Sequence, residues 1–343
     1  MKCPVCGNDC VKDAHELIER MPDIFAPCPR CKSRTLDKGA PLQEFYYATC
    51  DCGKRFIDEV FAQLYITMVE EGDLVPTDPL KKVGYPLIHP GFALTTAPFL
   101  PKNSLVLLSP NISPGTAWRI VHEVPEVRGV VKCGHFIPGA TDLDLTVPPR
   151  TYELLAGCDV RADIFYTPTH PFVVYKQQSK IHIEFPRGYD PKIIGVGACI
   201  RRKMPRMFID ADCGAGTLGI LAGMLGVPHV ILNDAWYAAS FWAAYNLQIN
   251  REYLLVKDDV HFFQKYEDME RHPVVRDPLK IAEMKGDQIF DVYQGDFRML
   301  PTILPKEKEM LTVLDLFEKG DPVFNERIRT EWKAQMGGDV FIP

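Results

Sequence analysis

The sequence of 343 residues predicts an α/β protein, in which a Rossmann-like C-terminal domain follows a β-rich α+β middle domain and a cysteine-rich N-terminal module. Seven of the eleven cysteines lie in the first 52 residues, and residues 103–187 contain several short β-like runs. Residues 206–343 alternate strand-like and helical segments, which is typical of a parallel sheet. We therefore divide the chain into an N-terminal module (1–56), a connector (57–102), a middle domain (103–200) and a Rossmann-like domain (201–343).

The C-terminal region supplies the elements of that sheet in order. MFIDAD is an apolar strand ending in an acid, GAGTLGILAGMLG is a glycine-rich turn entering a helix, and HVILND is the second strand. AWYAASFWAAYNLQIN predicts a helix, FDVYQGDF and LTVLDLF the next strands, and a helix over 325–335 precedes a final strand in DVFIP. Such a core would continue with another helix and two strands, so the domain is predicted to be shortened at its C-terminal end. Its last strand is then a sheet edge, which either a homodimer or packing of the middle domain would cover.

The two preceding regions give shorter signals. SLVLL, RGVVKCG, DLDLTV, FVVY and KIHIEF predict strands of the middle domain, with one helix near 116–124. The connector begins with a predicted helix over 56–71, and a stretch rich in proline and glycine follows it.

The N-terminal cysteines have the spacing of a metal site. Cys28 and Cys31 form one pair, and Cys50 and Cys52 form a second pair eighteen residues further on, after a predicted strand in EFYYAT. Four thiolates from two tight turns satisfy the tetrahedral preference of Zn²⁺. This predicts a structural zinc ribbon.

A third pair, Cys3 and Cys6, lies close to Cys10 and His15. One interpretation is a second zinc site made of these four residues. Another pairs Cys3 and Cys6 with Cys28 and Cys31, and leaves Cys50 and Cys52 to Cys10 and His15. A single zinc with spare thiols is the third.

Acidic residues gather at the predicted strand ends of the C-terminal domain. Asp210 and Asp212 lead into a turn that contains Gly214 and Gly216, where a helix begins and backbone N–H groups are free to bind a ligand. Asp234 ends the second strand, where a carboxylate can accept both ribose hydroxyls, and Asp296 follows the third, where it can accept from an adenine amino group. This combination favours S-adenosylmethionine over NAD, which would not need the third acid.

The same residues resemble a known family. FIDADCGAGTLGI with LNDAWYAASFWAAYNLQIN is similar to the class I methyltransferase core, and most similar to the archaeal/eukaryotic-type tRNA guanosine-N1 methyltransferases and the related aminocarboxypropyl transferases of the wybutosine pathway. RGVVKCG, YELLAG and IHIEFPRGYDPK resemble the domain that precedes the core in that family. The resemblance implies that Asp210, Gly214 and Gly216 line the methionine end of the cofactor, that Asp234 binds its ribose and that Asp296 binds its adenine. Arg187 would lie near the reacting centre.

The chain departs from the family at the fourth strand. N-methylating members have Asn-Pro-Pro and an aromatic residue there, whereas this sequence has Leu314-Asp315-Leu316-Phe317-Glu318. Asp315 or Glu318 is a candidate general base or a group that holds a polar substrate edge. The aminocarboxypropyl relatives also lack the tetrapeptide, so both kinds of transfer stay open.

Composition limits the choice of partner. Lys and Arg total 39 against 45 Asp and Glu, a net charge of −6, so a nucleic-acid contact would have to be a local patch. Candidates are Arg30, Lys32 and Arg34, and a second group at 201–206. We expect a cytoplasmic enzyme without a membrane span that acts on RNA, with tRNA as the first candidate. Alternatives are transfer to a small molecule or a protein, or a binding module without catalysis.

Overall fold

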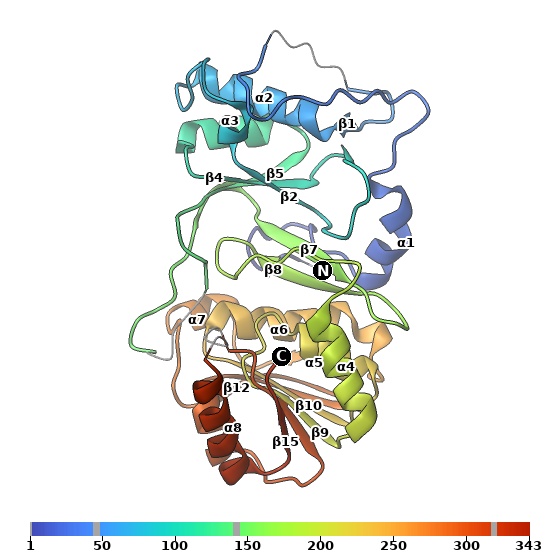
Figure 1. Cartoon of the computed structure of the whole chain (residues 1–343), viewed down its shortest axis with the longest axis vertical. Helices are drawn as coiled ribbons and strands as arrows, with labels where there is room; N and C mark the ends of the chain where they lie inside the picture. The colour runs from blue at the N-terminus through green and yellow to red at the C-terminus, as the bar shows by residue number, and fades with distance from the viewer. Residues whose placement is uncertain (1, 44–48, 140–144, 317–320) are drawn as a thin grey trace.

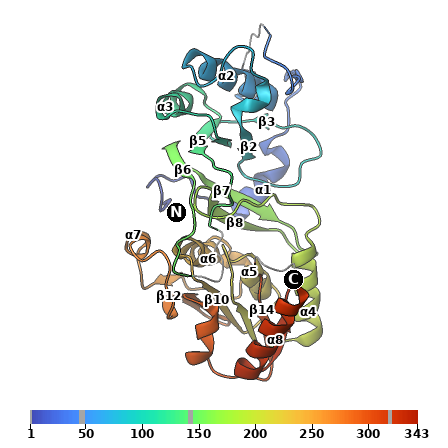
Figure 2. The ribbon, with the colours of Figure 1, turned by 60° about the vertical axis from the view of Figure 1, so that its left-hand side comes forward.

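A computed structural model describes residues 2–43, 49–139, 145–316 and 321–343. The chain forms three tiers along its long axis (Figure 1). An N-terminal tier holds α2 and α3 against a small sheet, a middle tier holds the β7–β8 hairpin, and the C-terminal tier holds the largest sheet with α4, α5, α6 and α8 around it. A view turned by 60° shows the same order (Figure 2), so the hairpin lies between the other two tiers.

The N-terminal tier is an α/β layer with strand order β2-β4-β5-β6, in which β4 and β5 are parallel and the outer pairs are antiparallel. Its elements are α2 (Ile57–Glu70), η1 (Leu80–Val83), β2 (Tyr85–Ile88), β4 (Leu105–Ser109), α3 (Pro114–Glu123), β5 (Val127–Lys132) and β6 (Glu153–Gly157), with the small pair β1 (Arg55–Phe56) and β3 (Phe99–Leu100) beside them. Residues 57–102, expected to be a connector, share one hydrophobic core with 103–130 and supply α2 and β2. The expected helix near 116–124 is α3, which Ser113 caps through the Thr116 amide.

A buried ion pair joins the end of the cysteine-rich segment to this layer. Arg55 binds Glu126 with two nitrogens (Nε to Oε1, 2.8 Å) and Gln63 with a third, and both charged side chains are 2% exposed. Bidentate geometry and a third acceptor offset the cost of removing these charges from water.

Removing one member of this pair leaves a buried charge without its partner. We expect Glu126→Ala to lower the free energy of unfolding by about 3–5 kcal/mol. Glu123→Ala, which removes an exposed carboxylate 3.0 Å from Arg119, is the control and should cost less than about 1 kcal/mol. Chemical denaturation of both variants measures the difference, and equal losses would contradict the prediction.

The middle tier consists of the antiparallel pair β7 (Val160–Phe165) and β8 (Phe172–Gln177), with α1 (Ala14–Ile24) against β8. Two buried asparagines of α6 fix the hairpin to the C-terminal tier. Asn246 accepts a hydrogen bond from the Tyr175 amide (2.7 Å) and donates to the Tyr175 carbonyl (2.8 Å). Asn250 does the same with Val173 (2.9 and 2.6 Å). Because Asn250, the C-cap of α6, follows Asn246 by four residues, both side chains lie on the same face of the helix.

One predicted strand of the middle domain does not form, since KIHIEF (180–185) has no strand pairing. In DLDLTV the described residues 145–147 form a turn and bend. The rest of DLDLTV, and the strand expected in EFYYAT except its last residue, lie outside the described residues.

The C-terminal tier contains the predicted Rossmann-like sheet, with strand order β11-β12-β13-β10-β9-β14-β15. Strands β13, β10, β9, β14 and β15 are parallel, and β11 and β12 add an antiparallel extension at the β13 edge. The elements are α4 (Pro191–Lys203), β9 (Met207–Asp210), α5 (Thr217–Met224), β10 (His229–Asp234), α6 (Tyr237–Ile249), η2 (Arg251–Tyr253), β11 (His261–Phe262), α7 (Tyr266–Glu270), β12 (Leu279–Lys285), β13 (Ile289–Gln294), η3 (Phe297–Thr302), β14 (Met310–Val313), α8 (Pro322–Met336) and β15 (Asp339–Phe341).

The central strands β9, β10 and β14 are buried on both faces. Alternate residues of β9 and β10 belong to two different cores, because side chains along a strand point to opposite faces. Phe208 and Leu232 pack into the core under α4, α5 and α6, whereas Ile209 packs into the one under α8 and η3. The result is a three-layer sandwich with the carboxyl ends of its parallel strands at one edge.

The expected terminal strand is present as β15, which pairs only with β14 among the described strands. No contact in the structure tests the homodimer expected at this edge. In the described part of the chain, none of the helices is both long enough and apolar enough to cross a membrane.

Candidate functional site

A cavity of about 250 Å³ lies where the carboxyl ends of β9, β10, β13 and β14 meet. This edge of a parallel sheet is the usual binding position in doubly wound folds. The N-terminal end of α4 and the extended segment 181–184 complete its wall. Six of the residues expected to form the site line this cavity, namely Asp210, Asp212, Gly214, Asp234, Asp296 and Asp315.

Three carboxylates surround the glycine-rich turn. Asp210 accepts a hydrogen bond from the Gly219 amide (3.1 Å), and Asp234 accepts from the amides of Gly214 (3.0 Å) and Trp236 (2.8 Å). Burial raises the pKa of Asp210 to about 7 and that of Asp234 to about 6. Burial also raises the pKa of Asp212 well above its usual range, and Asp234 and Asp210 add to the effect. One oxygen each of Asp210 and Asp212 is buried without a hydrogen-bond partner among the described residues. The turn therefore gathers three buried carboxyl groups that are harder to ionise than free ones, and a cationic ligand would favour their ionised form.

The fourth acid of the expected cofactor site is already paired. Asp296 is 5% exposed and accepts from both the backbone and the guanidinium of Arg298, at 2.6–3.0 Å. Arg298 also lines the cavity, so this side of it is close to electrically neutral.

The raised pKa of Asp210 predicts how stability depends on pH. The folded chain binds this proton more tightly than the unfolded chain does, so the contribution of Asp210 to stability is present at pH 4 and is lost as the pH rises to about 7. We expect Asp210→Asn to keep the Gly219 hydrogen bond, to match the native chain at pH 4 and to melt at a higher temperature at pH 8. Thermal unfolding at the two pH values measures this.

The matched control is Asp291→Asn. Burial alone would raise the pKa of Asp291, but hydrogen bonds from His229 and Lys280 lower it below the usual range. This carboxylate therefore stabilises the fold above pH 4, and its replacement should lower the melting temperature at pH 8. Destabilisation by both variants at pH 8 would contradict the expected sign for Asp210.

The two glycines of the turn have different surroundings. Gly214 lines the cavity and has a positive φ of 53°. Gly216 does not line the cavity; its φ is 88°, and an added Cβ would lie 3.2 Å from Ala243 of α6. Gly216 thus packs against α6 beneath the turn, and its contact with the cofactor stays a prediction.

On the opposite wall, Lys192 near the start of α4 binds Asp315 after β14 (2.8 Å), with Phe324 and Leu316 beside them. Arg187, expected near the reacting centre, is exposed and is not among the lining residues. Glu318, the other candidate base, lies outside the described residues.

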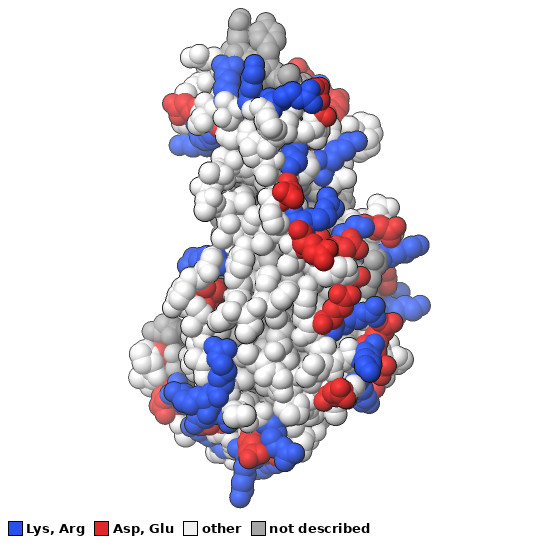
Figure 3. Space-filling view, turned by 90° about the vertical axis from the view of Figure 1, so that its right-hand side faces the viewer, with Lys and Arg blue, Asp and Glu red and all other residues white. Residues whose placement is uncertain are grey.

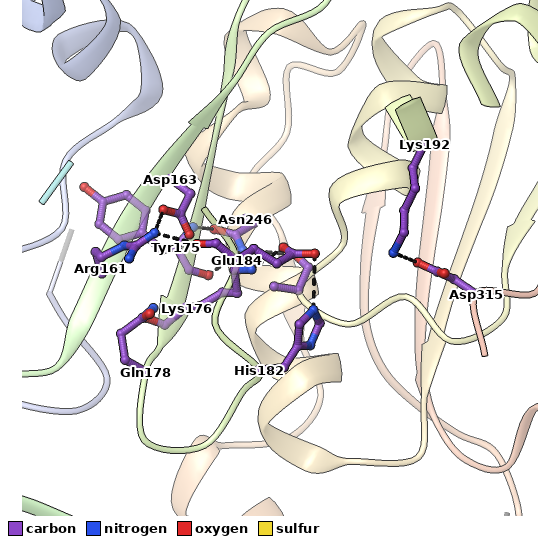
Figure 4. A network of polar contacts seen from close by, with 11 residues as sticks. Arg161, Asp163, Tyr175, Lys176, Gln178, His182, Glu184, Lys192, Asn246 and Asp315 are labelled. Carbon is purple, nitrogen blue, oxygen red and sulfur yellow. Dashed lines mark hydrogen bonds and ion pairs between the residues drawn. The ribbon is translucent and has the colours of Figure 1, made fainter. Parts of the chain in front are cut away.

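The segment 181–184 brings two further ionisable side chains to the cavity that the sequence analysis missed. His182 and Glu184 both line it, and His182 Nε2 lies 3.2 Å from Glu184 Oε1 (Figure 4). Lys176 of β8 binds the second oxygen of Glu184. The available signal was the alternation of polar and apolar residues in KIHIEF, which we interpreted as a strand.

The predicted zinc-ribbon cysteines come together. Cys28, Cys31, Cys50 and Cys52 form a cluster in which Sγ–Sγ distances are 3.5 Å (Cys28–Cys50), 3.7 Å (Cys28–Cys31) and 3.5 Å (Cys31–Cys52). Four sulfurs 2.3 Å from one zinc at tetrahedral corners are about 3.8 Å apart. The cluster therefore has the donors and the spacing of a structural zinc site.

The second cluster differs from each expected ligand set. Cys3, Cys6 and Cys10 meet Cys158, which follows β6 in the middle of the chain, with Sγ–Sγ distances of 3.5–3.8 Å. His15 lies 3.2 Å from Glu252 instead. Two of the expected arrangements were therefore wrong. Neither the set of Cys3, Cys6, Cys10 and His15 nor the pairing of Cys3 and Cys6 with Cys28 and Cys31 is present, and the structure has two four-cysteine clusters instead. No spacing rule pointed to Cys158, which stands alone in the sequence.

No protein-family model matches this chain, and no curated protein matches it. Among solved structures the chain is similar to Trm1 from Pyrococcus horikoshii in complex with S-adenosyl-L-methionine (18% identity, TM-score 0.31, covering 47% of this chain and 40% of that one). It is also similar to P. horikoshii TYW2 in complex with MeSAdo (14%, 0.37, 81% and 76%) and to Trm5b from Pyrococcus abyssi (14%, 0.32, 70% and 57%). The chain thus covers less than half of the length of the Trm1 chain. Likeness at this level assigns neither a family nor a function.

Proposed function

We propose that this chain is an S-adenosylmethionine-dependent methyltransferase that acts on RNA. The observation that carries the cofactor assignment is the group of three carboxylates with raised pKa values, Asp210, Asp212 and Asp234, around the turn that enters α5. A cationic ligand relieves their mutual repulsion, whereas the pyrophosphate of a dinucleotide would add to it. A sulfonium compound with an ammonium group and a ribose has the complementary charge.

Each acid then has a role that fits its position. Asp234 accepts the ribose hydroxyls, Asp296 with Arg298 borders the adenine, and Asp210, Asp212 and Gly214 border the methionine end. The bound sulfonium supplies an activated methyl group, so the protein has mainly to align the acceptor with it. Asp315, oriented by Lys192, would hold a polar edge of the acceptor, and Phe324 offers it an apolar surface.

The RNA assignment is supported by local positive charge on a chain that is acidic overall. Figure 3 shows Lys and Arg side chains gathered at the end of the molecule that the N-terminal tier forms, above a band with few charges. Three basic residues lie at the pair formed by Cys28 and Cys31: Arg30 lies within it, and Lys32 and Arg34 follow it. Arg30 is bound to Asp51 (2.6 Å). Thiolates that hold zinc must stay reduced, so we expect the enzyme to work in the cytoplasm.

Two measurements test the cofactor and the reaction. Calorimetry should show binding of S-adenosylmethionine and no binding of NAD⁺; failure to bind the former at 1 mM would reject the proposal. Incubation of the full chain with cell extract then uses cofactor labelled in the methyl group or, in parallel, in the carboxyl group. Methyl label in the RNA fraction supports the proposal, carboxyl label in RNA identifies aminocarboxypropyl transfer, and label in protein or small molecules corrects the substrate.

Filter binding of bulk tRNA tests the RNA partner separately. Phosphate contacts make affinity fall steeply between about 50 and 200 mM salt. We expect Lys32→Glu to weaken binding and to flatten the salt dependence, whereas Lys102→Glu, on another exposed loop, should have little effect. Equal binding by both variants would exclude the N-terminal basic group as the contact.

A further inference from the structure

We infer that His182, held by Glu184, is the group that takes up the proton of the acceptor during transfer, and hence that the acceptor is a nucleophile that carries a proton. The inference rests on the proposed function, because it concerns the same cavity. It starts from a histidine–carboxylate pair that faces the cavity and that neither the cofactor site nor the metal sites use.

The position of His182 is next to the cofactor turn. Its Cε1 lies 3.9 Å from the place where a Cβ on Gly214 would be, and the Gly214 amide binds Asp234. Figure 4 shows His182 and Glu184 on one side and the Lys192–Asp315 pair on the other. An acceptor between the two pairs would have the methionine end of the cofactor beside it and His182 within reach.

Glu184 is fixed in place by buried cations. Lys176, 1% exposed, binds its carboxylate, and Arg161, also 1% exposed, donates to its backbone carbonyl (2.8 Å) while it binds Asp163. Segment 181–184 has no strand partner among the described residues, so these side chains hold it where a sheet would otherwise do so. The buried cations thus fix Glu184, and Glu184 in turn orients His182 (Figure 4).

The charge of the network makes His182, not Glu184, the proton acceptor. Burial alone would raise the pKa of Glu184, but Lys176 and His182 outweigh it and hold that pKa well below its usual range. A carboxylate that is so strongly stabilised as an anion is a poor base, yet it stabilises an imidazolium beside it. Lys176 binds Glu184 and Arg161 binds Asp163, so each of these buried cations has a carboxylate partner.

The proton and electron pairs then balance within the cavity. The nucleophile gives its lone pair to the methyl carbon, and the electron pair of the carbon–sulfur bond stays on sulfur. The proton of the nucleophile passes to the imidazole of His182, whose Nε2 lies 3.2 Å from Glu184 Oε1, and it leaves to solvent after the product departs. An acceptor atom that bears no proton would not need this residue, so the pair favours an amino, ring N–H or hydroxyl group.

The test compares His182→Ala with His229→Ala in the labelled-methyl assay, using the acceptor fraction that the native enzyme labels. His229 forms a similar pair with Asp291 (2.9 Å) in the first halves of β10 and β13, away from the cavity, so it controls for the loss of a half-buried histidine–carboxylate pair. We expect His182→Ala to lose about 10²-fold or more in kcat, with the dissociation constant of S-adenosylmethionine and the KM of the acceptor little changed. Added imidazole should restore part of the rate, and His229→Ala should keep it. Glu184→Gln, which keeps a hydrogen-bond acceptor without the charge, should lower kcat less and leave KM unchanged.

The outcomes separate this inference from the function on which it rests. If the native enzyme labels a fraction and His182→Ala labels it equally fast, the role of His182 is overturned and the transferase function stands. The same conclusion follows if imidazole does not restore the rate of His182→Ala and the variant binds S-adenosylmethionine more weakly. Label on an atom that bears no proton in the unmodified acceptor overturns it too. If the native enzyme labels nothing, both are rejected.

Discussion

Asp234→Ala is expected to weaken binding of S-adenosylmethionine about a hundredfold. The carboxylate lies at the end of β10, where its oxygens accept from the amides of Gly214 and Trp236 and face the cavity. Charge-assisted hydrogen bonds to ligand hydroxyls are worth about 1.5–3 kcal/mol each, and 2.7 kcal/mol corresponds to a factor of about 100. Calorimetric titration at pH 8, where the carboxylate is ionised, measures the change.

Two further variants identify the cause. Asp234→Asn keeps an acceptor for one amide and removes the charge, so an affinity between those of the native chain and Asp234→Ala would show that both charge and hydrogen bonding contribute. Asp287→Ala removes an exposed carboxylate from the turn between β12 and β13 and should bind normally. Native affinity in Asp234→Ala would mean that the ribose does not lie at the end of β10.

The second large effect is expected for Cys158→Ser. The native chain should contain two zinc ions, and this variant should contain one, because a serine hydroxyl is a poor replacement for the fourth thiolate. The cluster joins the N-terminal segment to the middle of the chain, and the Tyr245 hydroxyl of α6 also binds the Lys2 carbonyl there (2.6 Å). Loss of this metal should lower the free energy of unfolding by about 3 kcal/mol or more.

Metal analysis and chemical denaturation of matched variants test this. Cys133→Ser changes a half-buried cysteine outside both clusters and should keep two zinc ions. Cys31→Ser should lose the other ion and leave the second cluster intact. A native chain with one zinc, or a Cys158→Ser variant with two, would contradict the assignment.

The sequence alone was sufficient for the five parallel strands of the C-terminal sheet, because they are short apolar runs and acids follow their ends, but the antiparallel strands β11 and β12 were missed. These are local patterns, and the parallel topology then brings Asp210, Asp234, Asp296 and Asp315 to one edge. The ribbon cysteines were equally local, since each pair lies on one turn.

What was missed depends on contacts between distant parts of the chain. Polar and apolar residues alternate in KIHIEF because Ile183 packs on the N-terminal layer while His182 faces the cavity. A segment whose polar side chains line a cavity therefore shows the same two-residue period as a strand. The helix at 57–70 was predicted, but its place in a core was not, because most of its partners lie in β4, α3 and β5, which follow much later in the chain. Cys158 has no neighbour in sequence that marks it as a ligand.

The two cysteine clusters differ in when their ligands exist on a growing chain. The cluster of Cys28, Cys31, Cys50 and Cys52 is complete once residue 52 has been synthesised. The second cluster lacks its fourth ligand until Cys158 has been synthesised. Cys3, Cys6 and Cys10 therefore provide only three thiolates while the N-terminal layer is being synthesised. Closing a loop of this length is costly until the layer has folded. The second cluster therefore cannot be completed until the strands of the N-terminal layer, which end at residue 157, have all been synthesised.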